Sequence, residues 1–237
     1  MLERVYSRVR QARLVSRTVI ATDDQRIFDA ARAFHAEVYL TDPGHSSGTD
    51  RVAEVAARFP EAAIIVNVQG DEPFIEPEAI EQAIQPLLAS ASAPVSTLKT
   101  ALRSRQQAED PNVVKVVTDR AGRALYFSRA CVPYIRDAAE AGRVSFYKHL
   151  GLYVYERDFL LRFPGLPRGP LEALEKLEQL RVLENGYAIQ VVETAWDSVG
   201  VDTEADLEEA RRLVAAATEP SAAADQGAGQ KAVGSRQ

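Results

Sequence analysis

Apolar residues recur along the chain at two alternating spacings, which predict strands and helices in turn. Val19–Ala21 and Glu37–Leu40 are short apolar runs that predict strands. Residues 62–68 are almost unbroken apolar, as expected for a strand covered on both faces in a parallel sheet. Such alternation is typical of a doubly wound α/β sheet. The helical spacing is carried by Ile27, Ala30, Ala31 and Phe34, and by Ile80, Ile84, Leu87 and Leu88 after Pro77.

The second half of the chain adds antiparallel features to this pattern. Apolar runs at 113–118 and 124–128 flank a short Asp-Arg-Ala-Gly turn, which predicts a β-hairpin. The fold class is therefore α/β and Rossmann-like: a mixed, mostly parallel sheet flanked by helices, with an antiparallel hairpin insertion. Further strands are predicted at 152–155 and 189–192, a long helix at 170–184 closed by Asn185-Gly186, and a last helix at 203–217.

The two ends of the chain differ in composition from its middle. In the first 17 residues, Leu2, Val5, Tyr6 and Val9 lie at helical spacing among five arginines. Such a segment is either an organelle transit peptide or the first helix of the domain, and its continuity with the next apolar run favours the helix. Residues 219–237 are rich in Ala, Gly, Ser and Gln without periodicity, which predicts a disordered tail after a folded domain of residues 1–218.

The composition favours a globular protein and argues against membrane proteins and non-specific nucleic-acid binders. With 237 residues, 46% of them hydrophobic and 26% charged, the chain has enough apolar material for one large α/β domain or two small ones. It has no run of 18 apolar residues and no secretory pattern, so we expect a soluble protein that does not enter a membrane. The net charge of −6 argues against non-specific nucleic-acid binding.

A bound metal ion would be held by carboxylates, because one cysteine and three histidines are too few for a thiolate or imidazole cluster. Asp71 and Glu72 follow the 62–68 strand, where they form either a Mg²⁺ site or a simple polar turn. Asp202 precedes the last helix. There it is either a second metal ligand or a charge at a helix start that Thr203 and Asp206 cap.

Polar residues gather in two further parts of the chain. Residues 42–51 form a loop rich in Gly, Ser and Thr, able to bring backbone donors and acceptors against a flat ligand, although an ordinary loop has the same composition. The second group suits a polyhydroxylated acid, because a guanidinium can hold a carboxylate through two parallel hydrogen bonds; each member alone is equally compatible with a structural or surface role. Its members are Arg129, Arg136, His149, Tyr153, Glu178 and Gln179.

Six segments of the chain together resemble one enzyme family. They occur in the order and approximate spacing of 3-deoxy-manno-octulosonate (Kdo) cytidylyltransferases, also called CMP-Kdo synthetases, and the resemblance covers roughly residues 1–215. The segments are His45-Ser-Ser-Gly-Thr-Asp-Arg51, Ile65-Val-Asn-Val-Gln-Gly-Asp-Glu-Pro73, Ala124-Leu-Tyr-Phe-Ser-Arg129, His149-Leu-Gly-Leu-Tyr153, Leu177-Glu-Gln-Leu-Arg181 and Gly200-Val-Asp-Thr203.

The resemblance implies a nucleotidyltransferase that joins CTP and Kdo to give CMP-Kdo and pyrophosphate. It implies a cytoplasmic homodimer that uses Mg²⁺ and serves lipopolysaccharide biosynthesis, with two small-molecule substrates and no nucleic-acid or membrane partner. Asp71 and Asp202 match the metal-binding, catalytic carboxylates. Ser47, Gly48, Arg51 and Gln69 match nucleotide contacts, and Arg129, Arg136, His149, Tyr153, Glu178 and Gln179 match the positions around the sugar acid.

The chain departs from the family at its front. The family begins with a strand and a basic phosphate-binding loop, whereas this sequence has no glycine before Gly44 and no lysine before Lys99. Either the chain is truncated, which would leave a central sheet position unfilled, or its start codon is assigned too far downstream; the second is favoured. Two alternatives to the main function follow: a cytidylyltransferase for a related sugar acid, or a non-catalytic remnant that binds a sugar acid or nucleotide.

Overall fold

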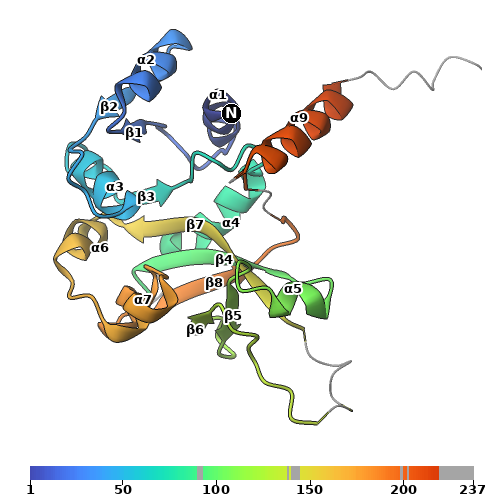
Figure 1. The fold of residues 1–237 in the computed structure, drawn as a ribbon. Helices are drawn as coiled ribbons and strands as arrows, with labels where there is room; N and C mark the ends of the chain where they lie inside the picture. Colours follow the sequence, from blue (N-terminus) through green and yellow to red (C-terminus); the bar gives the residue numbers. More distant parts are fainter. Residues whose placement is uncertain (90–92, 138, 140–144, 198–199, 202, 219–237) are drawn as a thin grey trace, which may run out of the picture. The chain divides into compact units, whose positions relative to one another are not determined.

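Two compact units make up the chain, residues 1–199 and residues 200–237, and each is described by itself; the described residues of the first unit contain eight strands. The computed structural model describes the whole chain except residues 90–92, 138, 140–144, 198–199, 202 and 219–237 (Figure 1). The predicted tail, 219–237, therefore lies outside the described residues, and so does Asp202. Within the described part, no helix is long and apolar enough to cross a membrane.

The strands form one mixed sheet and one separate parallel pair. The larger sheet has the order β6-β5-β7-β4-β8. Strand β3 pairs with the second half of β7, whereas β5 pairs with its first half. Figure 1 shows β7, β4 and β8 side by side. Parallel ladders join β1 to β2 and β4 to β8, while β3–β7, β4–β7, β5–β7 and β5–β6 are antiparallel. The bounds are β1 Ile20–Thr22, β2 Val38–Leu40, β3 Ile64–Asn67, β4 Val95–Ala101, β5 Lys115–Thr118, β6 Ala124–Ser128, β7 Tyr147–Glu156 and β8 Ile189–Glu193.

The expected α/β class, the mixed sheet and the β5–β6 hairpin are confirmed, but the expectation of mostly parallel pairing is wrong, because four of the six strand pairs in the described structure are antiparallel. Gly122 makes the hairpin turn with a φ of +77°, a conformation that glycine adopts without strain. The first seventeen residues do contain a helix, α1. The helices are α1 Leu2–Val9, α2 Gln25–Ala33, α3 Gly48–Ala56, α4 Pro77–Leu88, α5 Arg105–Glu109, α6 Arg157–Arg162, the 3₁₀ turn η2 Phe163–Gly165, α7 Pro170–Glu175, α8 Leu180–Glu184 and, in the second unit, α9 Glu204–Thr218.

Two apolar cores cover the two faces of the larger sheet. On one face, Val5 of α1 and Ile84 of α4 pack with Leu98 and Leu150 of the sheet. On the other face, residues of α3, α6 and α8 pack around Phe127. Each fully buried Leu, Ile or Phe contributes about 1.5–3 kcal/mol through removal of apolar surface from water. The sheet is therefore held between two helical layers.

The helix predicted over 170–184 is wrong in one respect, because it is broken into α7 and α8. Lys176 ends α7 in the left-handed conformation, with a φ of +55°. The carbonyl oxygen of Glu175, which the helix end leaves without an intrahelical partner, accepts a hydrogen bond from Arg129 Nε at 2.8 Å. Consequently Glu178 and Gln179 lie in a turn between two short helices rather than on one helix face.

A cavity of about 770 Å³ separates β1 from β3. Its walls include the two strands, with Val5 and Val9 from α1 and Val52 and Val55 from α3. The 62–68 strand was expected to be covered on both faces within a parallel sheet. Instead, β3 is antiparallel to its one partner in the described structure, β7, and Ile64, Ile65 and Val66 are half-buried because its other edge borders this cavity.

Candidate functional site

The loop predicted over 42–51 ends in helix α3, so that its last residues present a helix N-terminus. Ser47 is the cap: its hydroxyl oxygen accepts a hydrogen bond from the Asp50 amide at 3.2 Å. Gly48 is exposed, and a Cβ there would meet no atom within 4 Å. Arg51 is held by an ion pair with Asp23 at 3.0 Å, beyond the carboxyl end of β1. The arrangement offers backbone N–H groups and a fixed guanidinium on one edge, which suits an anionic ligand.

A second predicted segment, the Gln69–Glu72 turn, directly follows β3. Gln69 is exposed, and its Cγ lies 3.9 Å from the position of a Cβ on Gly151 of β7. Asp71 is half-buried at the same edge of the sheet, which places one carboxylate beyond the end of a strand. Such a carboxylate has the chemistry that Mg²⁺ prefers. Among the residues that the structure describes, no three Asp, Glu, His or Cys side chains are grouped for a metal; the second expected ligand, Asp202, lies outside them.

His149 lies deep in the sheet on β7, next to a break in register of the β4–β7 ladder at Thr97. The Thr97 hydroxyl donates to the Leu152 carbonyl oxygen at 2.8 Å, so Thr97 Oγ1 accepts the Nε2–H of His149 at 3.0 Å. This pair leaves Nδ1 as the acceptor of a neutral ring. Burial, together with the charge of Lys148, lowers the pKa of His149 from 6.5 to about 3. The imidazole is therefore uncharged at neutral pH.

We expect the free energy of unfolding to fall as the pH drops from 6.5 towards 3. In this window the unfolded chain binds a proton at residue 149 and the folded chain does not, so His149 contributes a slope of about 1.4 kcal/mol per pH unit. Urea unfolding at a series of pH values measures this slope. The variant His149→Gln should flatten it, whereas His35→Gln, at an exposed position, should not. Equal slopes for wild type and His149→Gln would contradict the assignment.

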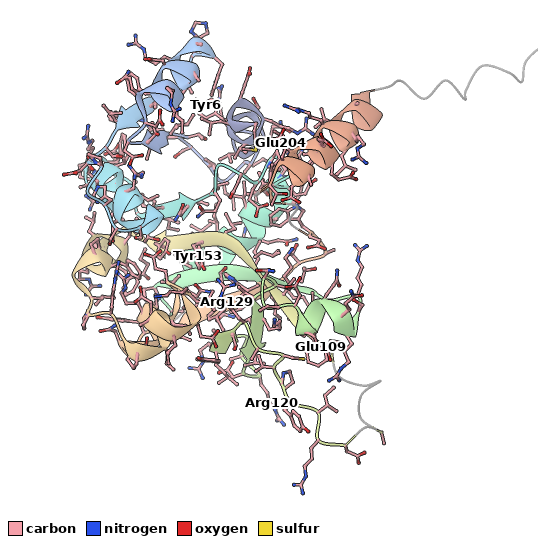
Figure 2. The ribbon with its side chains drawn as sticks, viewed as in Figure 1. Tyr6, Glu109, Arg120, Arg129, Tyr153 and Glu204 are labelled. Atoms are coloured by element: carbon pink, nitrogen blue, oxygen red, sulfur yellow. The ribbon has the colours of Figure 1, made fainter. Side chains whose placement is uncertain are left out.

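Aromatic rings flank His149 on its face of the sheet. The Phe127 ring centroid lies 4.9 Å away and that of Tyr153 lies 5.4 Å away. Burial, with Tyr155 and Glu178 nearby, raises the pKa of the Tyr153 hydroxyl well above its usual value, so Tyr153 is a hydrogen-bond donor at neutral pH. Figure 2 marks Tyr153 on β7 and Arg129 beyond the end of β6.

Arg129 is anchored by backbone carbonyl groups. Its Nε donates to the Glu175 carbonyl oxygen at 2.8 Å and its Nη1 to that of Pro111 at 3.0 Å, so Nη2 is left without a partner among the described residues. Lys115, which is fully buried, donates to the carbonyl oxygen of Arg129 at 2.6 Å. Arg136, in contrast, is exposed and makes no hydrogen bond or ion pair within the described part of the chain. No contact in the described structure links it to the other predicted residues, so its place in the site stays a prediction.

The turn between α7 and α8 joins the first loop directly. Glu178 is half-buried, and its Oε2 accepts a hydrogen bond from the hydroxyl of Thr49 in α3 at 2.6 Å; Gln179 is buried beside it. Sequence patterns did not point to Thr49, Thr97 or Arg181. Thr49 is one of several hydroxyl residues in the polar loop 42–51, and Thr97 and Arg181 are polar side chains in more apolar stretches, a pattern that many solvated residues share.

Known proteins resemble this chain over most of its length. It matches the family described as cytidylyltransferase over residues 1–193. It is 55% identical over 213 residues to a 3-deoxy-manno-octulosonate cytidylyltransferase of Syntrophotalea carbinolica, covering 87% of this chain and 85% of that one. The enzyme of the same name from Geobacter metallireducens is 56% identical over 216 residues, covering 88% of this chain and 85% of the relative.

Solved structures agree with these relatives. A CMP:2-keto-3-deoxy-manno-octonic acid synthetase complexed with CTP superposes with a TM-score of 0.86 at 40% identity, covering 91% of this chain and 88% of that one. A 4-diphosphocytidyl-2C-methyl-D-erythritol synthase superposes with a TM-score of 0.56 at 14% identity, covering 90% and 87%. This second likeness shows the fold alone.

Proposed function

The chain belongs to the 3-deoxy-manno-octulosonate cytidylyltransferase family of nucleotidyltransferases, and we propose that it joins CTP and Kdo to give CMP-Kdo and pyrophosphate. The observation that carries the proposal is the likeness of the whole fold to a synthetase complexed with CTP. The contact between Thr49 and Glu178 supports it, because it brings the predicted nucleotide loop against the predicted sugar-acid turn. Two substrates that react with each other need such adjacent sites.

On the nucleotide side, the backbone at Ser47 and Gly48, the Arg51 guanidinium and the Gln69 amide bind and orient CTP. Asp71 and Asp202 would hold Mg²⁺, which when bound supplies positive charge to the phosphate oxygens and the leaving pyrophosphate. The protein itself has a net charge of −6, so its own residues supply positive charge only locally, as at Arg51.

On the sugar side, the Arg129 guanidinium, with Arg136, binds the Kdo carboxylate. Tyr153 donates a hydrogen bond to a sugar oxygen, and Nδ1 of His149, Glu178 and Gln179 accept from sugar hydroxyl groups. His149 does not act as the general base: with a pKa of about 3, its ring is too weak a base at neutral pH to take the proton of the attacking hydroxyl. Its role is to orient the sugar.

The finer parts of the proposal concern the setting of the reaction. We place the enzyme in the cytoplasm as a homodimer that supplies an activated sugar acid to lipopolysaccharide biosynthesis. A folded domain of residues 1–218 carries the reaction, and residues 219–237 take no part in it.

Pyrophosphate release is the test of this function. We expect release only when CTP, Kdo and Mg²⁺ are all present, measured with a pyrophosphatase-coupled phosphate assay. Competition with an amino-Kdo and with a sialic acid decides which sugar acid the pocket prefers. Release that does not depend on Kdo, or that is faster with a sialic acid, would overturn the assignment of Kdo. A folded protein that never releases pyrophosphate would overturn the proposed activity.

A further inference from the structure

The hydrogen bond between Thr49 and Glu178 joins two segments that lie 129 residues apart in the sequence. Thr49 sits in the first turn of α3, between Gly48 and Arg51, and is 3% exposed. Glu178 sits in the turn between α7 and α8, next to Gln179. On the function proposed above, the bond therefore crosses directly from the nucleotide site to the sugar-acid site. None of the six motif segments predicts it.

The buried guanidinium of Arg181 lies next to the Glu178 carboxylate. Arg181 has a side chain only 2% exposed, and it binds Glu172 through two hydrogen bonds, Nε to Oε2 at 2.9 Å and Nη2 to Oε1 at 2.6 Å. The same Nη2 lies 3.7 Å from Glu178 Oε1, and the guanidinium carbon lies 4.6 Å from the Phe163 ring centroid. A guanidinium fixed on two sides in this way limits the positions that the Glu178 carboxylate can take.

A second chain of contacts joins the same two segments. Ser46, just before α3, donates its hydroxyl to Asp50 Oδ2 at 2.8 Å and accepts a hydrogen bond from Arg168 Nη2 at 2.7 Å. Arg168 in turn lies 3.8 Å from Glu172. Two sets of contacts therefore link α3 to α7 and the α7–α8 turn. Both sets end on the carboxylates around Arg181.

Two carboxylate oxygens of this network are buried without a hydrogen-bond donor in the described structure. They are Oδ1 of Asp50, a residue 8% exposed, and Oε1 of Glu178. A buried acceptor without a donor raises the free energy of the ligand-free protein. A hydroxyl or amino group of a bound ligand can relieve that cost. A bound ligand that donates a hydrogen bond to either oxygen would therefore stabilise this network.

We propose that the Thr49–Glu178 hydrogen bond couples the two substrate sites, so that each substrate binds more tightly when the other is present. This inference rests on the proposed function, since it takes CTP to bind at the start of α3 and the sugar acid to bind at Glu178. A ligand that fixes α3 fixes Thr49, and Thr49 then holds Glu178 in the orientation that binds the sugar. By linkage the effect is reciprocal, and the two factors of tightening must be equal. Arg181 is a positioning residue for Glu178.

The experiment measures binding without turnover. The probes are CTP and a Kdo analogue that lacks the attacking 2-hydroxyl, with dissociation constants obtained by calorimetry for each probe alone and in the presence of the other. For wild type we expect about tenfold tighter binding of each probe when the other is saturating. Thr49→Val keeps the shape of the side chain and removes the hydroxyl. In this variant the dissociation constant of each probe alone should change less than twofold, while the ratio of the constants measured without and with the other probe should fall to about one. Thr49→Ser, which restores a hydroxyl, should regain the ratio.

The outcomes separate the inference from the function on which it rests. Binding of both probes to wild type without any tightening, or an unchanged ratio in Thr49→Val, would overturn the coupling and leave the proposed function intact. If neither probe binds wild type, the proposed function fails and the inference falls with it. Should Thr49→Val melt below the assay temperature, Thr49→Ala is measured instead, with the same expectation. A loss of the ratio that Thr49→Ser does not regain would also count against the hydrogen bond.

Discussion

Asp71→Asn is expected to lower kcat by roughly 10²- to 10⁴-fold, because a metal contributes several kcal/mol of charge stabilisation to a phosphoryl-transfer transition state. Asparagine keeps the size of the side chain and one oxygen, but it removes the negative charge that would hold Mg²⁺. Asp71 is half-buried beyond the end of β3, so its replacement leaves the sheet intact. Pyrophosphate release at saturating CTP, Kdo and Mg²⁺ measures the effect.

A matched control separates the local effect from a loss of negative charge in general. Asp158→Asn removes the same charge from a side chain that is 88% exposed and whose one ion pair in the described structure is with its neighbour Arg157. This variant should keep wild-type turnover. Raising the Mg²⁺ concentration should partly restore Asp71→Asn, because weaker metal binding is compensated by mass action. Undiminished turnover in Asp71→Asn would refute its assignment as a metal ligand.

Glu172→Ala is expected to lower the free energy of unfolding by about 3–5 kcal/mol. The reason is the partner that it leaves behind: the Arg181 guanidinium is buried, and Glu172 accepts both of its short hydrogen bonds. The carboxylate that remains near Arg181, that of Glu178, lies 3.7 Å away and does not replace two short hydrogen bonds, so the buried charge stays poorly compensated. Urea unfolding followed by circular dichroism measures the difference.

The comparison variant is Glu109→Ala. Glu109 pairs with Arg105 one helical turn away in α5, at 2.8 Å, but both side chains are more than half exposed. A pair of this kind contributes about 0.3–0.5 kcal/mol, so the two variants should differ roughly tenfold in their effect. Equal losses of stability would mean that burial of Arg181 does not govern the strength of its ion pair.

Periodicity predicted the outer elements well and one central strand not at all. The apolar runs at β1, β2, β6 and β8 are short and bounded by polar residues, so they fall within a residue or two of the observed strands. β4 was missed because Ser96, Thr97 and Thr100 interrupt its apolar residues, although all three are buried. Thr97 is accommodated because its hydroxyl donates to a backbone carbonyl. That partner comes from β7, over fifty residues away, and a local pattern does not contain it.

In the candidate site too, the sequence indicates which residues take part but not the contacts that set their states. His149 and Glu178 could be singled out from the sequence because their segments resemble one enzyme family; as isolated residues, each is equally compatible with a structural or surface role. Their states could not: the neutrality of His149 follows from its depth in the sheet, and the orientation of Glu178 follows from Thr49 and Arg181. An arginine in a helix is ordinarily solvated, so the sequence does not predict that Arg181 is buried.

The cavity beside β3 has a consequence for how copies of this chain behave towards one another. The Arg157 amide donates to the Ala63 carbonyl oxygen at 2.9 Å, so the intervening positions, Ile64 and Val66, turn their backbone groups away from β7 and towards the cavity. β1 presents a second such edge across the gap. Exposed backbone edges recruit foreign strands and seed aggregation. Here residues of α1 and α3 line the same cavity as both edges. We therefore expect these two helices to hinder the pairing of β1 and β3 with strands of another copy, in addition to their contribution to the core.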